Sequence, residues 1–235
     1  MNQNPEPSPS RIAAFWISWG RCIKQHIALG VLAYLLYRFF FWTKAGLPSG
    51  HQVNRSWADA SVVFLFASLL AGPLNRLWPR FKVLIPWRRD IGLWFAITGG
   101  IHIGLLAQRR GWNVLGFFFN DQGEFLKAAA HASNWVGLLA LALTFFLVLT
   151  SNKFSETLLG HSSWKFVQQS AYSVFLLSVL HTFIFVYQVD ARKSEAFRWV
   201  FWIGIALVCG FQLWGLIYTT RLKRRSLKTR RKVSL

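Results

Sequence analysis

The sequence has few of the residues that build disulfide-rich or nucleotide-binding domains. Its 235 residues include only two cysteines, Cys22 and Cys209, which give neither a disulfide framework nor a metal-ligand spacing. It contains no G-x-G-x-x-G fingerprint and no Walker-type loop. The first ten residues, MNQNPEPSPS, lack the charged-then-apolar layout of a cleavable signal peptide. We therefore expect passive cysteines, no soluble nucleotide- or flavin-binding domain, and an uncleaved first apolar segment.

Apolar residues, by contrast, are abundant and occur in long blocks. They make up 54% of the chain, with 13 Trp and 22 Phe, and a soluble domain of this size could not bury so much apolar surface. A bilayer core ~30 Å thick requires blocks of about 20 residues. The sequence thus predicts an all-α membrane protein, a bundle of six transmembrane helices. Their approximate cores are 26–43, 58–75, 91–108, 130–150, 166–188 and 197–218.

The basic residues indicate how these spans are oriented. Acidic residues number only eight against 27 Lys and Arg, and the formal net charge is +19. In a membrane protein, Lys and Arg first mark the cytoplasmic loops, so we do not expect a nucleic-acid partner. Eighteen of the 27 fall on the side that holds both termini. We therefore expect a cytoplasmic arm over 1–20, a six-helix domain over 21–220 and a cytoplasmic tail over 221–235.

The tail, RLKRRSLKTRRKVSL, has eight basic residues and no acidic one. The simpler interpretation is an anchor on anionic membrane lipid, because each basic residue near such a surface contributes roughly 1 kcal/mol. A docking site for an acidic cytoplasmic partner is the alternative.

Two of the six histidines lie inside predicted spans. His26, His51 and His161 fall at membrane borders or in loops, and His131 opens the fourth span at the outer border. His102 and His181 lie within the third and fifth spans, which both run from the cytoplasm outward. Counting at ~1.5 Å per residue places both roughly 10–14 Å from the outer charged boundary. The spacing therefore predicts two imidazoles at one depth on parallel helices.

Such a pair has two interpretations. Each histidine could simply hydrogen-bond a neighbouring helix, but ionisable groups inside a bilayer tend to mark function, and facing imidazoles hold haem iron from both sides. Gly99 and Ser178 stand three residues before His102 and His181, on the same helix faces, where small side chains would let a porphyrin approach the backbone. Small residues also occur where membrane helices pack closely. We expect His102 and His181 to ligate the iron of one haem b.

Two stretches resemble a known family. GPLNRLWPRFKVLIPWRRDIGLWFAITGGIH, which ends at His102, and LALALTFFLVLTSNKFSETLLGHSSWKFVQQSAYSVFLLSVLH, which ends at His181, resemble the ferric-reductase-like transmembrane domain family. Within that family they look like the haem-binding membrane subunits of periplasmic methionine sulfoxide reductase systems. The resemblance covers roughly residues 58–220 and implies that both terminal histidines ligate haem.

The chain departs from the family at the inner side of the membrane. The family's fifth span usually carries another histidine thirteen residues before the last one, and here that position is Gln168. Thirteen residues correspond to ~20 Å of helix, so the missing ligand belongs to a second site nearer the cytoplasm. Fourteen residues before His102 stands Arg88, which is no substitute. We expect this inner site to lack a bis-histidine haem.

The resemblance implies an electron-transfer subunit of the bacterial inner membrane rather than a self-contained enzyme. Its acceptor would be a periplasmic molybdopterin-containing reductase of oxidised methionine. Its donor would be a cytoplasmic flavin reductase or quinone, so a flavin would enter only through a partner. Arg109, Arg110 and His131 could pair with haem propionates at the outer rim, although arginines there often serve lipid headgroups. The rival interpretation is a structural or assembly subunit of a larger membrane complex with one haem or none.

Overall fold

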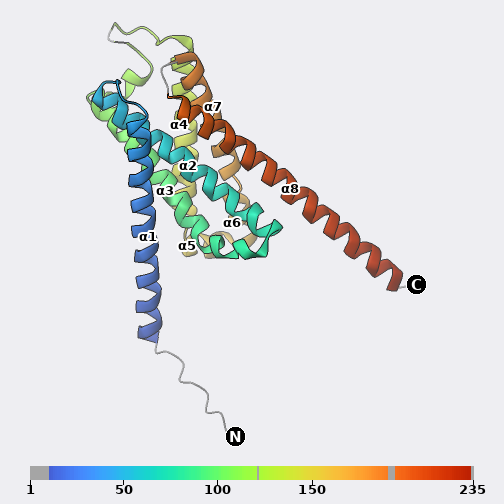
Figure 1. Ribbon diagram of the computed structural model, residues 1–235. Coiled ribbons are helices and arrows are strands. Elements are labelled where there is room, and N and C mark those ends of the chain that lie inside the picture. Colours follow the sequence, from blue (N-terminus) through green and yellow to red (C-terminus); the bar gives the residue numbers. More distant parts are fainter. Residues whose placement is uncertain (1–10, 121, 190–193, 234–235) are drawn as a thin grey trace.

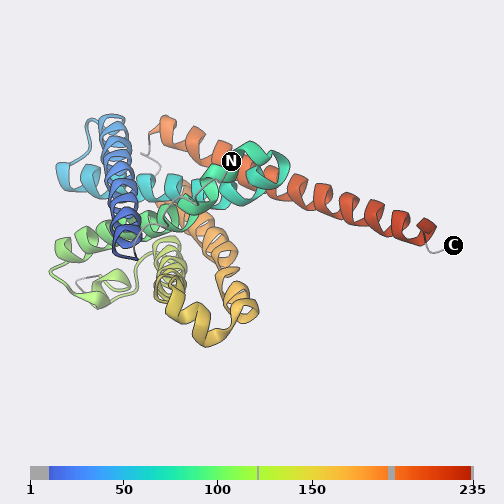
Figure 2. The same ribbon diagram turned by 90° about the horizontal axis from the view of Figure 1, so that it is seen from below.

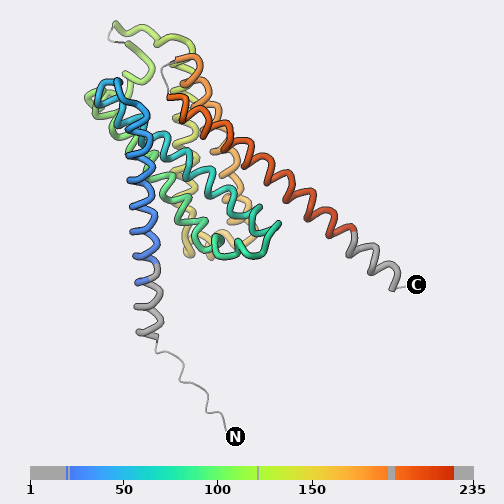
Figure 3. Tube along the Cα trace, in the orientation of Figure 1, coloured from blue at the N-terminus to red at the C-terminus, as the bar shows by residue number. Residues whose placement is uncertain are grey.

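The computed structural model describes residues 11–120, 122–189 and 194–233, with the side chains of 11–19, 21 and 225–233 left out (Figure 3). Helices account for nearly all of this part, and its only β pairing is an isolated bridge between Phe119 and Phe125. The elements are α1 (Arg11–Trp42), α2 (Ser49–Leu77), η1 (Pro79–Leu84), α3 (Ile85–Arg109), η2 (Val114–Phe117), α4 (Ala128–Thr150), α5 (Lys153–Leu159), α6 (His161–Gln168), α7 (Ala171–Ile184), the π-helical η3 (Phe185–Val189) and α8 (Glu195–Val233).

Five stretches are long and apolar enough to cross a membrane, which is the architecture of a multi-pass membrane protein. They are Ser49–Leu77, Pro79–Arg109, Ala128–Thr150, His161–Val189 and Glu195–Arg224. These five contain the predicted cores from 58–75 onward. The first predicted core, 26–43, lies within α1 except for its last residue, but α1 is not among the five in the described residues. The all-helical membrane class is confirmed, whereas a sixth span stays a prediction.

Helix α2 lies at the centre of the bundle (Figures 1 and 2). It packs against α3, α8 and α1, whereas α4 packs mainly on α7. Between these groups, α3 and α4 make few contacts. The C-terminal half of α8 leaves the bundle, and both ends of the described chain point to its lower side in Figure 1. The bundle thus consists of two packed units, α1–α2–α3–α8 and α4–α7.

The helix boundaries differ from the expected ones in the fifth span and at both ends of the six-helix domain. The fifth span is not a single α-helix, because α6 ends at Gln168 and α7 begins at Ala171, with a turn at Gln169 and Ser170. The basic tail expected over 221–235 does not begin at a break, because α8 continues through Arg221 to Val233. Of the expected N-terminal arm, residues 1–10 lie outside the described residues and 11–20 belong to α1.

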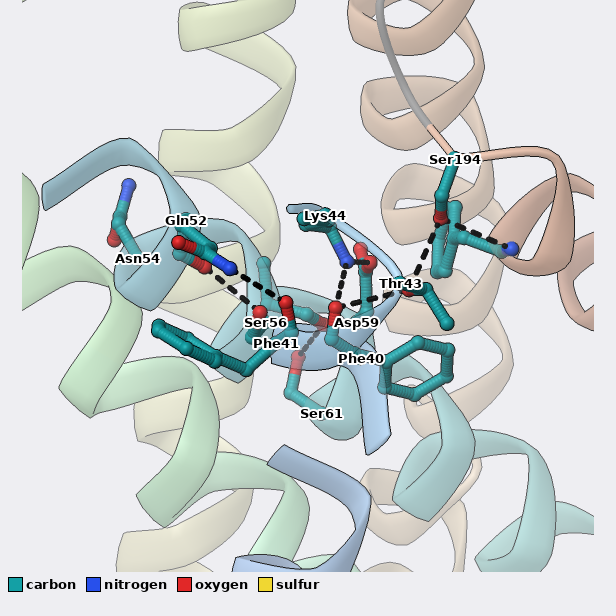
Figure 4. Close-up of polar contacts among 12 residues, drawn as sticks. Phe40, Phe41, Thr43, Lys44, Gln52, Asn54, Ser56, Asp59, Ser61 and Ser194 are labelled. Carbon is teal, nitrogen blue, oxygen red and sulfur yellow. Dashed lines mark hydrogen bonds and ion pairs between the residues drawn. The ribbon is translucent and has the colours of Figure 1, made fainter. Parts of the chain in front are cut away.

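Polar contacts join the N-terminal half of α2 to the C-terminal end of α1, and that end of α1 to the N-terminal end of α8. Lipid tails are as apolar as leucine, so membrane helices associate through close packing and interhelical polar bonds. Lys44 Nζ forms an ion pair with Asp59 Oδ2 of α2, and the two side chains are 0% and 1% exposed (Figure 4). Thr43 Oγ1 lies 3.3 Å from Ser194 Oγ, which accepts a hydrogen bond from Phe197 N at the start of α8. This network joins α1, α2 and α8 at one level.

Gly204 marks the closest approach of α8 to α2. A Cβ built on Gly204 would lie 2.1 Å from Cδ2 of the buried Phe66, so only glycine lets the helices meet here. We expect Gly204→Ala to lower the free energy of unfolding by roughly 1–3 kcal/mol, as overpacking of a filled core usually does. Unfolding in mixed micelles with increasing dodecyl sulfate measures this change in the free energy of unfolding.

Gly210→Ala is the matched control on the same helix. A Cβ there meets nothing within 4 Å, and the residue is exposed. This variant should be neutral, or more stable by up to about 1 kcal/mol through helix propensity. Equal destabilisation by the two variants would contradict the proposed close approach.

Candidate haem site

His102 lies on α3, seven residues before the last residue of the helix, Arg109. Its imidazole is partly buried, and Nδ1 is 3.3 Å from the backbone oxygen of Asn54 on α2. A carbonyl oxygen only accepts, so this hydrogen bond requires the proton on Nδ1. The neutral ring then carries its lone pair on Nε2, which is the nitrogen suited to bind a metal.

His181 has the same arrangement on the other packed unit. It lies on α7, and Nδ1 is 2.7 Å from the backbone oxygen of Ser133 on α4. The hydroxyl of the fully buried Ser133 donates to the backbone oxygen of His181 at 3.3 Å. Ser133 Oγ also lies 3.2 Å from Nδ1, but the shorter contact with the carbonyl defines the tautomer. The Nε2 of His181 is therefore the nitrogen suited to bind a metal as well.

A glycine on α4 admits the His181 ring. A Cβ built on Gly137 would lie 2.8 Å from Nδ1 and 2.9 Å from Cε1 of His181, closer than real Cβ contacts. The imidazole thus rests directly on the backbone of α4. Any larger residue at 137 would force the ring to move away from Ser133.

The two histidines lie at the same end of the bundle. Asn54 and Ser133 are each the sixth residue of their helix, and α2 and α4 both begin at the upper end in Figure 1. In both helix pairs, α2 with α3 and α4 with α7, the two hydrogen-bonded residues are 48 positions apart in the chain. An equal membrane depth of the two histidines stays a prediction. One histidine belongs to each of the two packed units, His102 to α1–α2–α3–α8 and His181 to α4–α7.

The donor set fits haem iron better than a bare metal ion. Zinc and copper centres take three or more protein ligands, whereas porphyrin supplies four nitrogens and leaves two axial positions for imidazoles. Among the described residues, no group of three or more His, Cys, Asp or Glu is placed to hold a metal ion. A backbone carbonyl on each Nδ1 is the usual second partner of a metal-bound histidine. The residues present therefore fit a bis-histidine haem.

Buried polar groups of α2 adjoin this layer. The Arg55 guanidinium lies 5.6 Å from the centre of the Phe185 ring, and that ring stacks on His181 with centroids 6.5 Å apart. Arg55 itself is only 7% exposed. In the described part of the chain, Asn54 Oδ1 is a buried atom without a hydrogen-bond partner. Its side chain points away from the Lys44–Asp59 network (Figure 4).

Gly99 and Ser178 occupy the same faces as the histidines, as the spacing requires, but with different surroundings. A Cβ on Gly99 would meet Ser61 Cβ of α2 at 4.0 Å, an ordinary packing distance, so Gly99 faces the α2–α3 contact. Ser178 is partly buried one turn before His181. Contact of either residue with a porphyrin stays a prediction.

The residues expected at the outer rim are engaged by the protein itself. Arg109 Nη2 lies 2.7 Å from His51 Nε2, and Arg110 donates to the backbone oxygen of Gly116. The ring of His131 packs edge-on against Phe125, and its Nε2 accepts a hydrogen bond from Trp135 Nε1 at 3.3 Å. The structure thus places these three residues in or beside the loop between α3 and α4, where each contacts other protein groups. Their role toward propionates stays a prediction.

Gln168 has a structural role at the C-terminal end of α4. Its amide nitrogen donates to Thr150 Oγ1 at 3.2 Å, and its amide oxygen accepts from Ser151 Oγ at 3.3 Å. These bonds tie the end of α6 to the end of α4. Arg88 donates from Nε to the backbone oxygen of Ser68 at 3.2 Å. Neither side chain offers an imidazole at this level.

Sequence reasoning missed the residues that hold the two imidazoles. Asn54 and Ser133 act through backbone carbonyls, which carry no sequence signal, and Gly137 is one of 17 glycines. Arg55 had a visible signal, because a charged residue close to an apolar span is costly unless it has a role.

Fold and site together define a multi-pass helical membrane protein with two histidines on separate helices, each hydrogen-bonded to a backbone carbonyl of a neighbouring helix. The chain is 27% identical, over 176 residues, to the protein-methionine-sulfoxide reductase heme-binding subunit MsrQ of Enterobacter sp. (strain 638). The match covers 73% of this chain and 82% of that protein. No family model matches the chain. The similarity supports a distant, MsrQ-like relationship and, at this low identity, a membrane haem electron-transfer role.

Proposed function

We propose that this protein is a haem b electron-transfer subunit of the bacterial inner membrane that passes electrons toward a periplasmic reductase of oxidised methionine. The observation that carries the proposal is the matched pair His102 and His181, each with its Nδ1 on a backbone carbonyl of the neighbouring helix. The name of the Enterobacter relative, a haem-binding subunit of a methionine sulfoxide reductase, supports it.

The chain's own residues hold and orient the axial ligands. Haem, when bound, accepts and releases one electron at a time. The carbonyls of Asn54 and Ser133 keep the protons on Nδ1, so both imidazoles would offer Nε2 to a haem iron. Gly137 lets the His181 ring remain on the α4 backbone. The buried charge of Arg55 lies in this layer and offers a partner for carboxylate groups such as propionates.

Haem count and orientation belong to the same proposal. Gln168 already bonds Thr150 and Ser151, which supports one haem per chain at the outer site rather than two. We propose six spans with both termini in the cytoplasm, α1 being the first, because basic residues are concentrated on that side. Electrons would enter from a cytoplasmic flavin reductase or from quinone, and a molybdopterin-containing periplasmic subunit would accept them.

A structural or assembly subunit of a larger membrane complex is the second candidate. Gln168 favours it, since a position that carries histidine in the resembled family serves here to join α6 to α4. Such a protein would keep the fold with one haem or none. The two candidates differ in whether bound haem exchanges electrons.

We expect purified protein from haem-replete cells to contain close to one haem b per chain. Two imidazoles give low-spin iron, so sharp α and Soret bands should change with dithionite, and a pyridine haemochrome assay measures the stoichiometry. Reoxidation of the reduced haem by an added soluble reductase would favour the electron-transfer subunit, whereas a haem that is not reoxidised would favour the structural subunit. A colourless preparation would refute the proposal, and two haems per chain would refute the role assigned to Gln168.

A further inference from the structure

The loop between α3 and α4 has a defined conformation. Asn113 Oδ1 accepts from Leu115 N at 3.0 Å and so begins the short helix η2. Leu126 N donates to Phe118 O at 2.9 Å, beside the Phe119–Phe125 bridge. Asn134 Nδ2 of α4 donates to Phe117 O and ties the loop to the bundle. These bonds hold the described parts of the loop, 110–120 and 122–127, in one arrangement.

The loop starts with an unusual backbone conformation at Trp112. Helix α3 ends in a Schellman motif, in which Gly111 N donates to Gln108 O at 3.1 Å and Trp112 N donates to Ala107 O at 2.8 Å. Gly111 has φ +59°, which glycine adopts freely, but the next residue, Trp112, has φ +62°. Among the described residues, it is the only non-glycine with positive φ. For a bulky side chain this conformation is strained.

The strained residue does not pack into the protein. The residue at this position of a Schellman motif often makes a hydrophobic contact with the last turn of the helix, yet Trp112 is 69% exposed. Backbone strain at a non-glycine residue tends to occur where a side chain is presented for function. Glycine would satisfy the backbone here without strain, so the indole itself requires an explanation.

Trp112 belongs to a group of exposed apolar side chains, which we call the loop patch. Its members are 66–69% exposed and are Trp112, Val114, Leu115 and Phe125. In Figure 1 the loop rises beyond the upper ends of the helices. Its tip is polar, with Asn120 Nδ2 within 3.2 Å of Gln122 Oε1 and 3.1 Å of Glu124 Oε2. A bonded amide and carboxylate cluster is suited to water rather than to lipid.

We propose that the loop patch is the docking surface for the soluble electron-accepting protein, with Trp112 as its main anchor. This inference rests on the proposed function. The loop joins the end of α3, which carries His102, to the start of α4, which binds His181, so a partner seated on it is close to both. Electron transfer weakens steeply with distance, which requires docking at this end. Exposed aromatic patches rimmed by polar residues are typical of protein interfaces, where Trp is a frequent energetic anchor.

The test uses the full-length chain in lipid nanodiscs and, as probe, a purified periplasmic molybdopterin-containing methionine sulfoxide reductase. Binding is measured by biolayer interferometry, and the rate of reoxidation of dithionite-reduced haem by anaerobic stopped flow. Trp112→Gly, which relieves the strain while removing the indole, should weaken binding and lower the second-order rate by at least about tenfold. Phe125→Ala should show a smaller loss. Haem content and spectrum should match the unsubstituted protein.

Phe154→Ala is the control, because Phe154 is 76% exposed at the opposite end of the bundle, on α5. It should leave binding and rate unchanged. Unchanged values for Trp112→Gly and Phe125→Ala, or no binding by the unsubstituted protein, would overturn the docking surface. The fluorescence of Trp112 is the difference between the unsubstituted protein and Trp112→Phe. If brominated lipid quenched this difference, Trp112 would instead lie in the membrane. A protein without haem bands would refute the proposed function. The binding measurement does not depend on haem, so it would still test the docking surface separately.

Discussion

Replacing either His102 or His181 by alanine is expected to remove most of the haem. Each substitution deletes one axial ligand and leaves a five-coordinate iron held by one helix pair alone. Loss of a group that merely orients a metal ligand costs roughly 10–100-fold in metal affinity, so loss of the ligand should cost at least as much. Pyridine haemochrome per protein, measured on variants from one expression host, gives the result directly.

The matched controls are substitutions at residues outside the proposed ligand pair. Gln168→Ala should retain outer haem, because Gln168 bonds Thr150 whereas His181 bonds Ser133, and these two residues lie about 25 Å apart along α4. His26→Ala and His161→Ala should also retain it, since His26 bonds Trp94 and the exposed His161 bonds Glu156. If both ligand variants kept full haem while Gln168→Ala lost it, the inner site would be the occupied one.

Gly137→Val is expected to impair haem retention about as strongly as loss of an orienting partner, roughly 10–100-fold in affinity. The new side chain would occupy the space of His181, whose Nδ1 and Cε1 lie 2.8 and 2.9 Å from a Cβ at this position. The ring would have to leave the carbonyl of Ser133, and Nε2 would lose its orientation toward the iron. Haem titration into apoprotein, followed at the Soret band, measures the affinity.

Gly100→Val supplies the comparison for this substitution. Gly100 lies on α3 two residues before His102, and a Cβ there meets nothing within 4 Å. We expect haem affinity close to that of the unsubstituted protein, because neither imidazole would have to move. Equal losses in the two variants would mean that valine weakens haem binding generally, and that Gly137 has no special relation to His181.

The membrane class and the approximate helices could be predicted from the sequence, because a bilayer imposes a length and an apolar composition on each span. The predicted cores from 58–75 to 197–218 all lie within helices that meet these requirements. The turn at Gln169 and Ser170 and the continuation of α8 could not be predicted in this way. Both depend on local hydrogen bonding, which apolar composition does not record.

For the candidate site, the sequence by itself determined which two histidines lie within candidate membrane spans, and it predicted a similar depth for both, since a helix converts residue number into distance. Only the tertiary structure decided how each ring is held. Asn54 and Ser133 reach the imidazoles through backbone oxygens 48 positions away in the chain, and Gly137 admits the His181 ring by lacking a side chain. Every residue has a backbone carbonyl, so the choice of these two oxygens follows from how α2 packs on α3 and α4 on α7.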